Sequence, residues 1–180
     1  MMIRRAVNED TRRIAEIHVS SWQVAYDSLI PADYLNGLSV ARREAVWVAA
    51  IDEARGPVFV SSVEDRIVGF CHVAPSRDED SEGCAEITAI YVAPSFWRQG
   101  HGHALCEEAV SYAEREAFCD ITLWVIAENR RARRFYERMG FFGDGGFKSV
   151  ERPGFVLNEV RYRRKFSAGE GQPAISRCPP

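Results

Sequence analysis

The sequence predicts a layered α/β or α+β domain, in which helices cover the faces of a mixed sheet. Three observations predict this class. Apolar residues recur at helical spacing in the N-terminal part, and the pattern then changes to short runs rich in β-branched and aromatic residues. Three strand-like runs follow one another in the middle of the chain. Helical patterns separate the later runs, so the predicted order is β-α-α-β-β-β-α-β-α-β-β.

The N-terminal part is expected to contain a short strand and two amphipathic helices. Asn8, Glu9 and Asp10 supply a cap and an acidic first turn for the first helix. Pro31 and Gly37 confine a short helical piece before the second helix. The expected elements are a strand over 3–7, a helix from about 11 to 26, and a helix over 40–54.

The rest of the chain is expected to contain six strands and two helices. The segment SRDEDSEG, residues 76–83, is polar and acidic, which is typical of a loop. Asn129 suits the N-cap of a helix, and Gly140 suits the left-handed residue after its end. The expected strands cover 58–63, 67–73, 84–92, 121–126, 142–150 and 155–164, and the helices follow residue 102 and cover 130–139.

Length and composition favour a single globular domain. The chain has 180 residues, of which 46% are hydrophobic and 27% charged, so it can bury a sizeable core. We expect one domain over residues 1–166. The last segment, SAGEGQPAISRCPP, has little to bury, and we expect residues 167–180 to be a mobile tail.

Charge, hydropathy and cysteine content limit the partners and the cellular location that we expect. The formal net charge of −3 provides no basic footprint, which argues against a nucleic-acid partner. No apolar run approaches the roughly 18 residues of a membrane helix, and the N-terminal MMIRRAVNEDTRR lacks the apolar core of a signal peptide. Five cysteines without a C-x-x-C pair favour reduced, mostly buried thiols. We therefore expect a cytoplasmic protein that does not bind membranes.

The stretch FWRQGHGHAL, residues 96–105, joins a strand to a helix and admits three interpretations. Gly100 and Gly102 would let backbone N–H groups approach a phosphate at the positive end of the helix macrodipole. His101 and His103 could be a metal pair, but residues two apart on a helix do not share a face and no further ligand has suitable spacing, so we expect no metal. The third interpretation is a plain turn with two exposed histidines.

Two motifs, taken together, give this stretch a context. IYVAPSFWRQGHGHAL, residues 90–105, is followed by a β-rich segment and then by ENRRARRFYERMGF, residues 128–141. In this combination the chain resembles the GNAT superfamily of acyl-CoA-dependent N-acetyltransferases, over about residues 2–164 in element order. The resemblance implies a mixed sheet that is splayed between the strand ending at Val92 and the strand over 121–126. It also implies that the pantetheine arm of acetyl-CoA lies in that opening.

The resemblance implies a pyrophosphate-binding loop before the helix. The family pattern is Q/R-x-x-G-x-G/A, and Trp97 stands here in place of its first residue. One side-chain contact therefore differs from the family, whereas Gly100 and Gly102 keep the backbone cradle. Neighbouring Arg98 would add positive charge for the phosphates.

Further contacts to acetyl-CoA follow from the same resemblance. Backbone groups of Ile90 and Val92 would pair with the pantetheine amides, as an added strand does. Asn129 would contact the cosubstrate near its pantetheine, besides capping its helix. The complete implied set is Ile90, Tyr91, Val92, Arg98, Gln99, Gly100, His101, Gly102, His103, Ala104, Asn129 and Tyr136.

Acyl transfer to an amine needs a neutral nucleophile, stabilisation of an oxyanion and a proton for the leaving thiolate. Tyr136 matches the family position of the general acid, and a phenol of pKa about 10 is protonated at neutral pH. Glu86 matches a position where many members carry a general base, acting directly or through water. The Val92 amide is the expected donor to the acetyl carbonyl. The alternative for Tyr136 and for Glu86 is a purely structural role.

The acceptor pocket of the family is built largely from its first helices. In the segment SWQVAYDSLIPADYL, residues 21–35, we expect Trp22, Tyr26 and Tyr34, together with Glu86, to bind the acceptor. Aromatic rings can hold an ammonium group by cation–π contact, although such residues also form cores. The leading prediction is acetylation of a small-molecule amine. The alternatives are acetylation of a protein N-terminus or lysine, and a non-catalytic acyl-CoA sensor; the resemblance is compatible with a homodimer.

Overall fold

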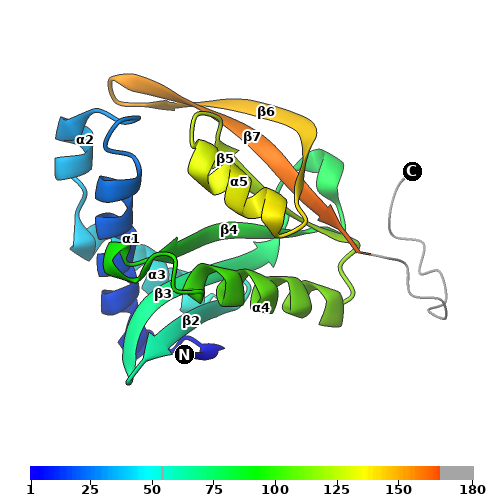
Figure 1. Cartoon of the computed structure of the whole chain (residues 1–180), viewed down its shortest axis with the longest axis horizontal. Coiled ribbons are helices and arrows are strands. Elements are labelled where there is room, and N and C mark those ends of the chain that lie inside the picture. The colour runs from blue at the N-terminus through cyan, green and yellow to red at the C-terminus, as the bar shows by residue number, and fades with distance from the viewer. Residues whose placement is uncertain (54, 167–180) are drawn as a thin grey trace.

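The structure, a computed structural model, describes residues 1–53 and 55–166. In this part seven strands form one sheet in the order β1-β2-β3-β4-β5-β7-β6, accompanied by five α-helices (Figure 1). The strands are β1 (Met2–Arg5), β2 (Val58–Val63), β3 (Arg66–Pro75), β4 (Ala85–Val92), β5 (Asp120–Ile126), β6 (Phe142–Arg152) and β7 (Phe155–Lys165). The helices are α1 (Thr11–Ala25), α2 (Ala32–Asn36), α3 (Val40–Asp52), α4 (His101–Arg115) and α5 (Arg130–Arg138). The predicted layered α/β fold is confirmed.

Helices cover both faces of the sheet. One core cluster joins α4 and α5 to the sheet through residues such as Leu105 and Tyr136, and a second joins α1 and α3 to the other face through residues such as Ile14 and Trp47. Figure 1 shows α4 and α5 in front of the sheet and α1 and α3 behind it. The apolar stripe of α4 faces the sheet, and its residues Leu105, Ala109 and Ala113 are fully buried.

The two halves of the sheet meet at a short parallel junction. Strands β1 to β4 pair antiparallel, as do β5, β7 and β6, whereas β4 and β5 are parallel. The β4–β5 pairing contains only Ala85↔Ile121, Glu86↔Thr122 and Ile87↔Leu123. Beyond these pairs the strands separate, so residues 88–92 of β4 and 124–126 of β5 border what we call the opening. The predicted splay lies at this place.

A β-bulge marks the residue at which β4 leaves β5. The register between β3 and β4 shifts between His72 and Val73, which leaves Thr88 as the extra residue of β4. The Thr88 hydroxyl and His72 Nδ1 lie 2.6 Å apart. A bulge bends its strand and increases its twist, which fits the divergence of β4 from β5 after Ile87.

Several element boundaries differ from the expectation. The short helical piece between Pro31 and Gly37 forms a separate helix, α2, so three helices rather than two precede β2. Strands β6 and β7 extend as far as the pair Arg152↔Phe155, because Pro153 and Gly154 form a tight turn instead of a longer break. The first helix ends at Ala25, and α3 ends at Asp52 rather than near residue 54, which is outside the described residues.

Cys71, Cys84 and Cys106 are buried free thiols, as expected. Cys119 is disulfide-bonded, so the expectation of reduced thiols is wrong there, because sequence spacing does not show which cysteines meet in space. The expected tail, residues 167–180 with Cys178, lies outside the described residues. Within the part of the chain that the structure describes, no helix is long and apolar enough to cross a membrane.

Candidate active site

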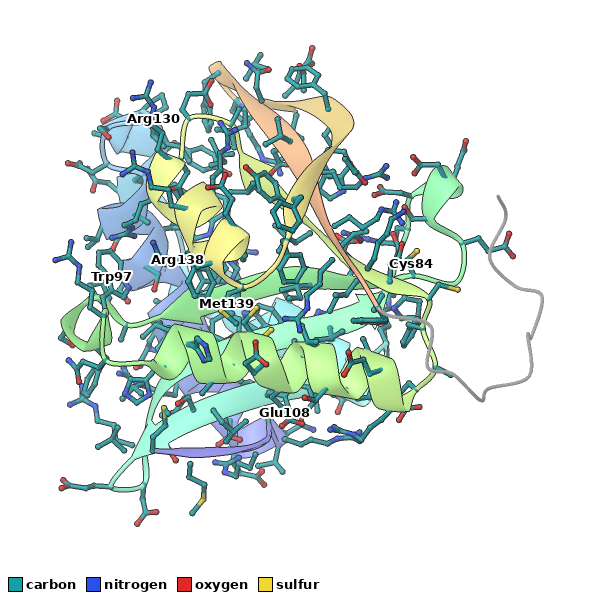
Figure 2. All side chains as sticks on the ribbon, turned by 45° about the vertical axis from the view of Figure 1, so that its right-hand side comes forward. Cys84, Trp97, Glu108, Arg130, Arg138 and Met139 are labelled. Atoms are coloured by element: carbon teal, nitrogen blue, oxygen red, sulfur yellow. The ribbon has the colours of Figure 1, made fainter. Side chains whose placement is uncertain are left out.

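A cavity of about 440 Å³ occupies the opening between β4 and β5. Its walls come from β4 and β5, from α1, from the start of α5, and from the β6–β7 hairpin. Glu86, Tyr136 and Asn129 all line it, so the structure brings together side chains predicted from distant parts of the sequence. Figure 2 shows Trp97 and Cys84 near opposite ends of β4, with Met139 between α4 and α5.

The backbone of β4 offers polar groups to the cavity. The Ala93 N–H donates to the Val68 carbonyl at 2.8 Å, and by antiparallel alternation Tyr91 and Ala89 also bond toward β3. The N–H and C=O groups of Ile90 and Val92 therefore point toward the opening. The Val92 carbonyl accepts hydrogen bonds within the chain from the Trp97 indole at 2.6 Å and from the Ser21 hydroxyl at 3.0 Å.

These hydrogen bonds determine which backbone group of Val92 can bind a ligand. Its carbonyl has two donors from the chain, whereas its N–H faces the opening. A ligand amide or carbonyl can therefore meet the N–H of Val92 and both backbone groups of Ile90. Sequence reasoning could not foresee the two donors, because Ser21 is 71 residues away in the chain.

The start of α4 has free backbone donors that could hold an anion. Gly100 is the N-cap with φ +88°, and no side chain caps the helix. The Ala104 N–H bonds to the Gly100 carbonyl, while the N–H groups of the first three helical residues have no acceptor within the helix. A Cβ added to Gly100 would meet no atom within 4 Å outside its chain neighbours and its own helix, so the space beside Gly100 is open. Free N–H groups and the macrodipole suit a phosphate.

The two histidines of this stretch have different environments. His101 is 3% exposed, its Nδ1 lies 2.8 Å from the Ser61 hydroxyl, and its ring packs edge-on against Phe96. Burial lowers the pKa of His101. The expectation of two exposed histidines is therefore wrong for His101, whose hydrogen bond to Ser61 connects α4 to β2. It is confirmed for His103, which is exposed. No group of three metal-ligating side chains occurs among the described residues.

Trp97 joins the loop before α4 to α5. The Arg131 guanidinium lies 3.9 Å from the centre of the Trp97 ring, a cation–π contact, and both residues line the cavity. Arg98 adopts a left-handed conformation with φ +61° and is exposed, as is Gln99, whose side chain donates to the Ser95 carbonyl at 3.0 Å. At this position the family pattern has a polar side chain, whereas Trp97 connects the loop to α5 through its contact with Arg131.

On α5, Asn129 and Tyr136 face the cavity. The Asn129 side-chain oxygen accepts from the Ala132 N–H at 3.1 Å, which confirms the predicted helix cap. Tyr136 is 9% exposed and packs edge-on against Phe135 and Phe141. Burial, followed by the nearby Cys106 and Tyr91, raises the pKa of Tyr136 well above 10. The phenol is therefore protonated and can donate a hydrogen bond over the whole physiological pH range.

Glu86 lies at the junction where β4 and β5 still pair. It is 3% exposed, and its Oε1 lies 3.2 Å from Nη2 of Arg77, a mostly exposed side chain. The loop that carries Arg77 is fixed to the sheet, since Asp78 accepts from the Trp124 indole at 3.0 Å and from Arg161 at 3.2 Å. The Glu86 carboxylate is thus a buried acceptor whose nearest cation comes from a neighbouring loop.

The aromatic residues of the N-terminal helices divide into two groups. Trp22 and Tyr26 line the cavity and pack edge-on against each other, 5.1 Å between ring centroids. Tyr34 instead packs against Phe155 at 4.9 Å, in a cluster that joins α2 to the β6–β7 hairpin. Tyr34 therefore supports the wall of the cavity and is not among its lining residues.

Sequence reasoning missed the charged residues that line the cavity besides Glu86. They are Arg77, Arg131, Lys148, Arg152 and Glu159. The alternation in FKSVER, residues 147–152, could have placed Lys148 and Arg152 on one face of a strand. It could not have shown that β7 inserts between β5 and β6 and turns that face toward the cavity.

A splayed mixed sheet, uncapped N–H groups at one helix start and a buried tyrosine and glutamate in the opening are the features expected of an acyltransferase. Comparisons with known proteins identify the family. The sequence profile of the Acetyltransferase (GNAT) family matches residues 8–141. An uncharacterized N-acetyltransferase of Bacillus subtilis is 32% identical over 127 residues, which is 71% of this chain and 72% of that relative. The chain belongs to the GNAT family and is an acetyltransferase.

Solved structures share the fold. The PaiA N-acetyltransferase of Thermoplasma acidophilum, in complex with coenzyme A, has a TM-score of 0.69 at 18% identity and covers 92% of this chain and 98% of its own. The structure of YncA of Salmonella typhimurium, with its cofactor acetyl-CoA, has a TM-score of 0.72 at 18% identity and covers 97% of this chain and 98% of its own. At these identities the likeness concerns the fold.

Proposed function

We propose that this enzyme transfers an acetyl group from acetyl-CoA to a primary amine of a small molecule by direct attack. The observation that carries the proposal is the end of β4–β5 pairing at Ile87 and Leu123. Beyond this point the two strands separate and leave the cavity that Glu86 and Tyr136 line. The start of α4, which no side chain caps, follows the end of β4 along the chain. Two fold relatives with coenzyme A or acetyl-CoA support the choice of cosubstrate.

The residues of the opening fit that cosubstrate. The free N–H groups at the start of α4 suit a pyrophosphate, and the space at Gly100 lets it approach the backbone. Arg98 and Arg131 add positive charge beside this loop. The outward backbone groups of Ile90 and the N–H of Val92 suit the amides of a pantetheine arm, which would lie along β4 as an added strand.

Three groups of the chain take part in the reaction. When bound, acetyl-CoA supplies an activated thioester carbonyl. Glu86 accepts a proton from the attacking amine, directly or through water, and the Val92 N–H donates to the carbonyl oxygen. Tyr136 donates its proton to the sulfur as the C–S bond breaks and the C–N amide bond forms. Tyr136 then regains a proton from solvent, and Glu86 releases the proton of the amine to solvent.

Trp22 and Tyr26 are proposed to bind the acceptor, and Tyr34 to hold the hairpin wall in place. Two alternatives are kept for testing: a protein N-terminus or lysine as acceptor, and an acyl-CoA sensor without turnover. The cytoplasmic location and the homodimer expected from the sequence also stay predictions.

Two measurements on the purified protein test the proposal. Calorimetric titration with acetyl-CoA should show binding, and thiol release should follow when amino acids, polyamines, aminoglycosides or peptides are added. Release with small amines but not with peptides supports the proposal, and the reverse supports a protein acceptor. Binding without release for every amine would favour the sensor. No binding of any acyl-CoA would contradict all three.

A further inference from the structure

The lining of the cavity has an excess of positive charge, although the whole chain has a net charge of −3. The lining contains four cations and two anions, a balance of +2. They are Arg77, Arg131, Lys148 and Arg152, with Glu86 and Glu159. A pocket for an acceptor that carries only amino groups would need the opposite sign.

Only one of the four cations belongs to the cosubstrate side. Arg131 stacks on Trp97, beside the start of α4, where phosphates are proposed to bind. Arg77 reaches Glu86, and Lys148 lies 3.9 Å from the centre of the Trp124 ring and 3.4 Å from Glu159. Of the other three cations, Arg77 lies beside Glu86, whereas Lys148 and Arg152 lie on the hairpin wall of the cavity.

The β6–β7 hairpin explains why these charges converge. Lys148, Val150 and Arg152 alternate along β6 and share one face, opposite Glu159 and Leu157 on β7. All five line the cavity. Figure 1 shows the tip of this hairpin beside α2, in agreement with the Tyr34–Phe155 contact. The hairpin thus presents a polar, largely basic face to the cavity.

The ion pairs leave one cation of this face without a carboxylate. Glu86 is paired with Arg77 and Glu159 with Lys148. Arg152 donates to the Glu151 carbonyl at 3.2 Å and forms no ion pair with any other described residue. Its guanidinium is exposed and retains donors that match a carboxylate in a bidentate manner.

We propose that the acceptor is an amine that also carries a carboxylate, such as an amino acid, with Arg152 and Lys148 holding the carboxylate while Glu86 receives the amine. This inference rests on the proposed function and specifies its substrate class. Diamines and polyamines are disfavoured, because their second ammonium would meet the unpaired Arg152 beside the Lys148–Glu159 pair. Lys148 binds the carboxylate at the expense of its contact with Glu159.

The first experiment compares matched acceptors in the thiol-release assay. Each amino acid is paired with its C-terminal amide, and aminobutyrate is paired with putrescine. We expect kcat/KM to be about tenfold or more higher for the carboxylate of each pair, the size of one charge-assisted hydrogen bond. The amide has the less basic amine, which favours the amide, so the comparison is conservative. Equal or higher values for the amides would overturn the proposal.

Arg152→Gln should remove most of this preference, with about a tenfold loss for the carboxylate substrate and little change for its amide. Arg42→Gln on the exposed surface of α3 is the control and should change neither value. A preference that survives Arg152→Gln and Lys148→Gln unchanged would overturn the assignment of these residues.

A binding experiment separates this proposal from the proposed function. N-acetyl amino acids and their amides are titrated, with coenzyme A present, while the indole N–H resonance of Trp124 is followed by NMR and assigned with Trp124→Phe. We expect shifts with the carboxylates and not with the amides. Such shifts without any turnover would contradict acetyl transfer but keep the carboxylate site. Equal shifts, or none at millimolar concentration, would overturn the carboxylate site even in an active enzyme.

Discussion

The indole N–H of Trp97 donates a hydrogen bond to the Val92 carbonyl, with 2.6 Å between the two atoms. The Ser21 hydroxyl donates to the same oxygen at 3.0 Å. These bonds tie the end of β4 to the loop before α4 and to α1. Because the Val92 carbonyl already accepts two hydrogen bonds, the N–H of Val92 is the group that can bind a ligand.

A shared acceptor predicts that Trp97 and Ser21 do not act independently on stability. Trp97→Phe and Ser21→Ala each leave one donor on the Val92 carbonyl, so each loss of the hydrogen bond should cost about 1 kcal/mol. The double variant leaves that carbonyl with neither donor and should cost about 1 kcal/mol more than the sum. Urea denaturation of the four proteins measures this coupling. Strictly additive losses would contradict the shared-acceptor account.

Tyr136→Phe should lower kcat about 100-fold while the Kd of acetyl-CoA stays within about twofold, because only the proton donor is lost. The raised pKa of Tyr136 also predicts no loss of activity from its ionisation below about pH 10. Steady-state kinetics and calorimetry give the two constants.

The control for that variant is Tyr162→Phe. Tyr162 is also buried, but its hydroxyl donates to Glu137 at 2.9 Å and it is not a lining residue. Its kcat should match the wild type. An unchanged kcat in Tyr136→Phe would remove Tyr136 from the reaction.

Glu86→Gln should lower kcat about 100-fold, since the amide keeps the shape of the side chain but accepts no proton from the amine. Glu82→Gln makes the same change on an exposed residue of the neighbouring loop and should keep full activity. Rates measured from pH 6 to 9 with one amine test this. Equal rates for Glu86→Gln and wild type would show that water or another group takes the proton.

Buried histidines predict a loss of stability in mild acid. Burial lowers the pKa of His18 to about 3 and that of His72 to about 4, against about 6.5 when unfolded. The unfolded chain therefore binds more protons below pH 6.5, and the free energy of unfolding should fall from pH 6.5 to about pH 4 by on the order of a few kcal/mol.

His18→Phe tests the source of this dependence. His18 stacks on Tyr91 with 4.7 Å between ring centroids and is surrounded by other rings, so phenylalanine suits the site. Chemical denaturation of the variant should show a smaller difference between pH 7 and pH 5 than the wild type. The same difference in both proteins would contradict the prediction.

The fold was largely predictable because each main element had a local signal. The alternation and β-branched runs located the strands, and Asn129 located the cap of α5. The boundaries of the β6–β7 hairpin were less predictable, since Pro153 and Gly154 indicate a turn but not its length. The insertion of β7 between β5 and β6 depends on long-range pairing, which leaves no local pattern.

The position of Gly100 at the start of α4 and that of Tyr136 in the cavity were predictable, because backbone conformation or family resemblance specified them. Burial of His101 was not, because the alternation of glycine and histidine says nothing about the Ser61 hydroxyl that meets it. The basic face of the hairpin was also missed, since Lys148 and Arg152 reach the cavity only through the order of the strands.

The cradle at the start of α4 is the central claim, and calorimetry of acetyl-CoA binding tests it most directly. Gly100→Ala places a Cβ in the proposed phosphate space, and Gly154→Ala is a matched control, since both glycines have positive φ (+88° and +85°) and free space around the added Cβ. The strain of the left-handed conformation, about 1 kcal/mol, should therefore be similar in both variants. We predict binding by the wild type and Gly154→Ala with similar Kd, and a Kd at least about tenfold higher for Gly100→Ala. Equal Kd values for all three proteins, or no binding by the wild type, would contradict the account.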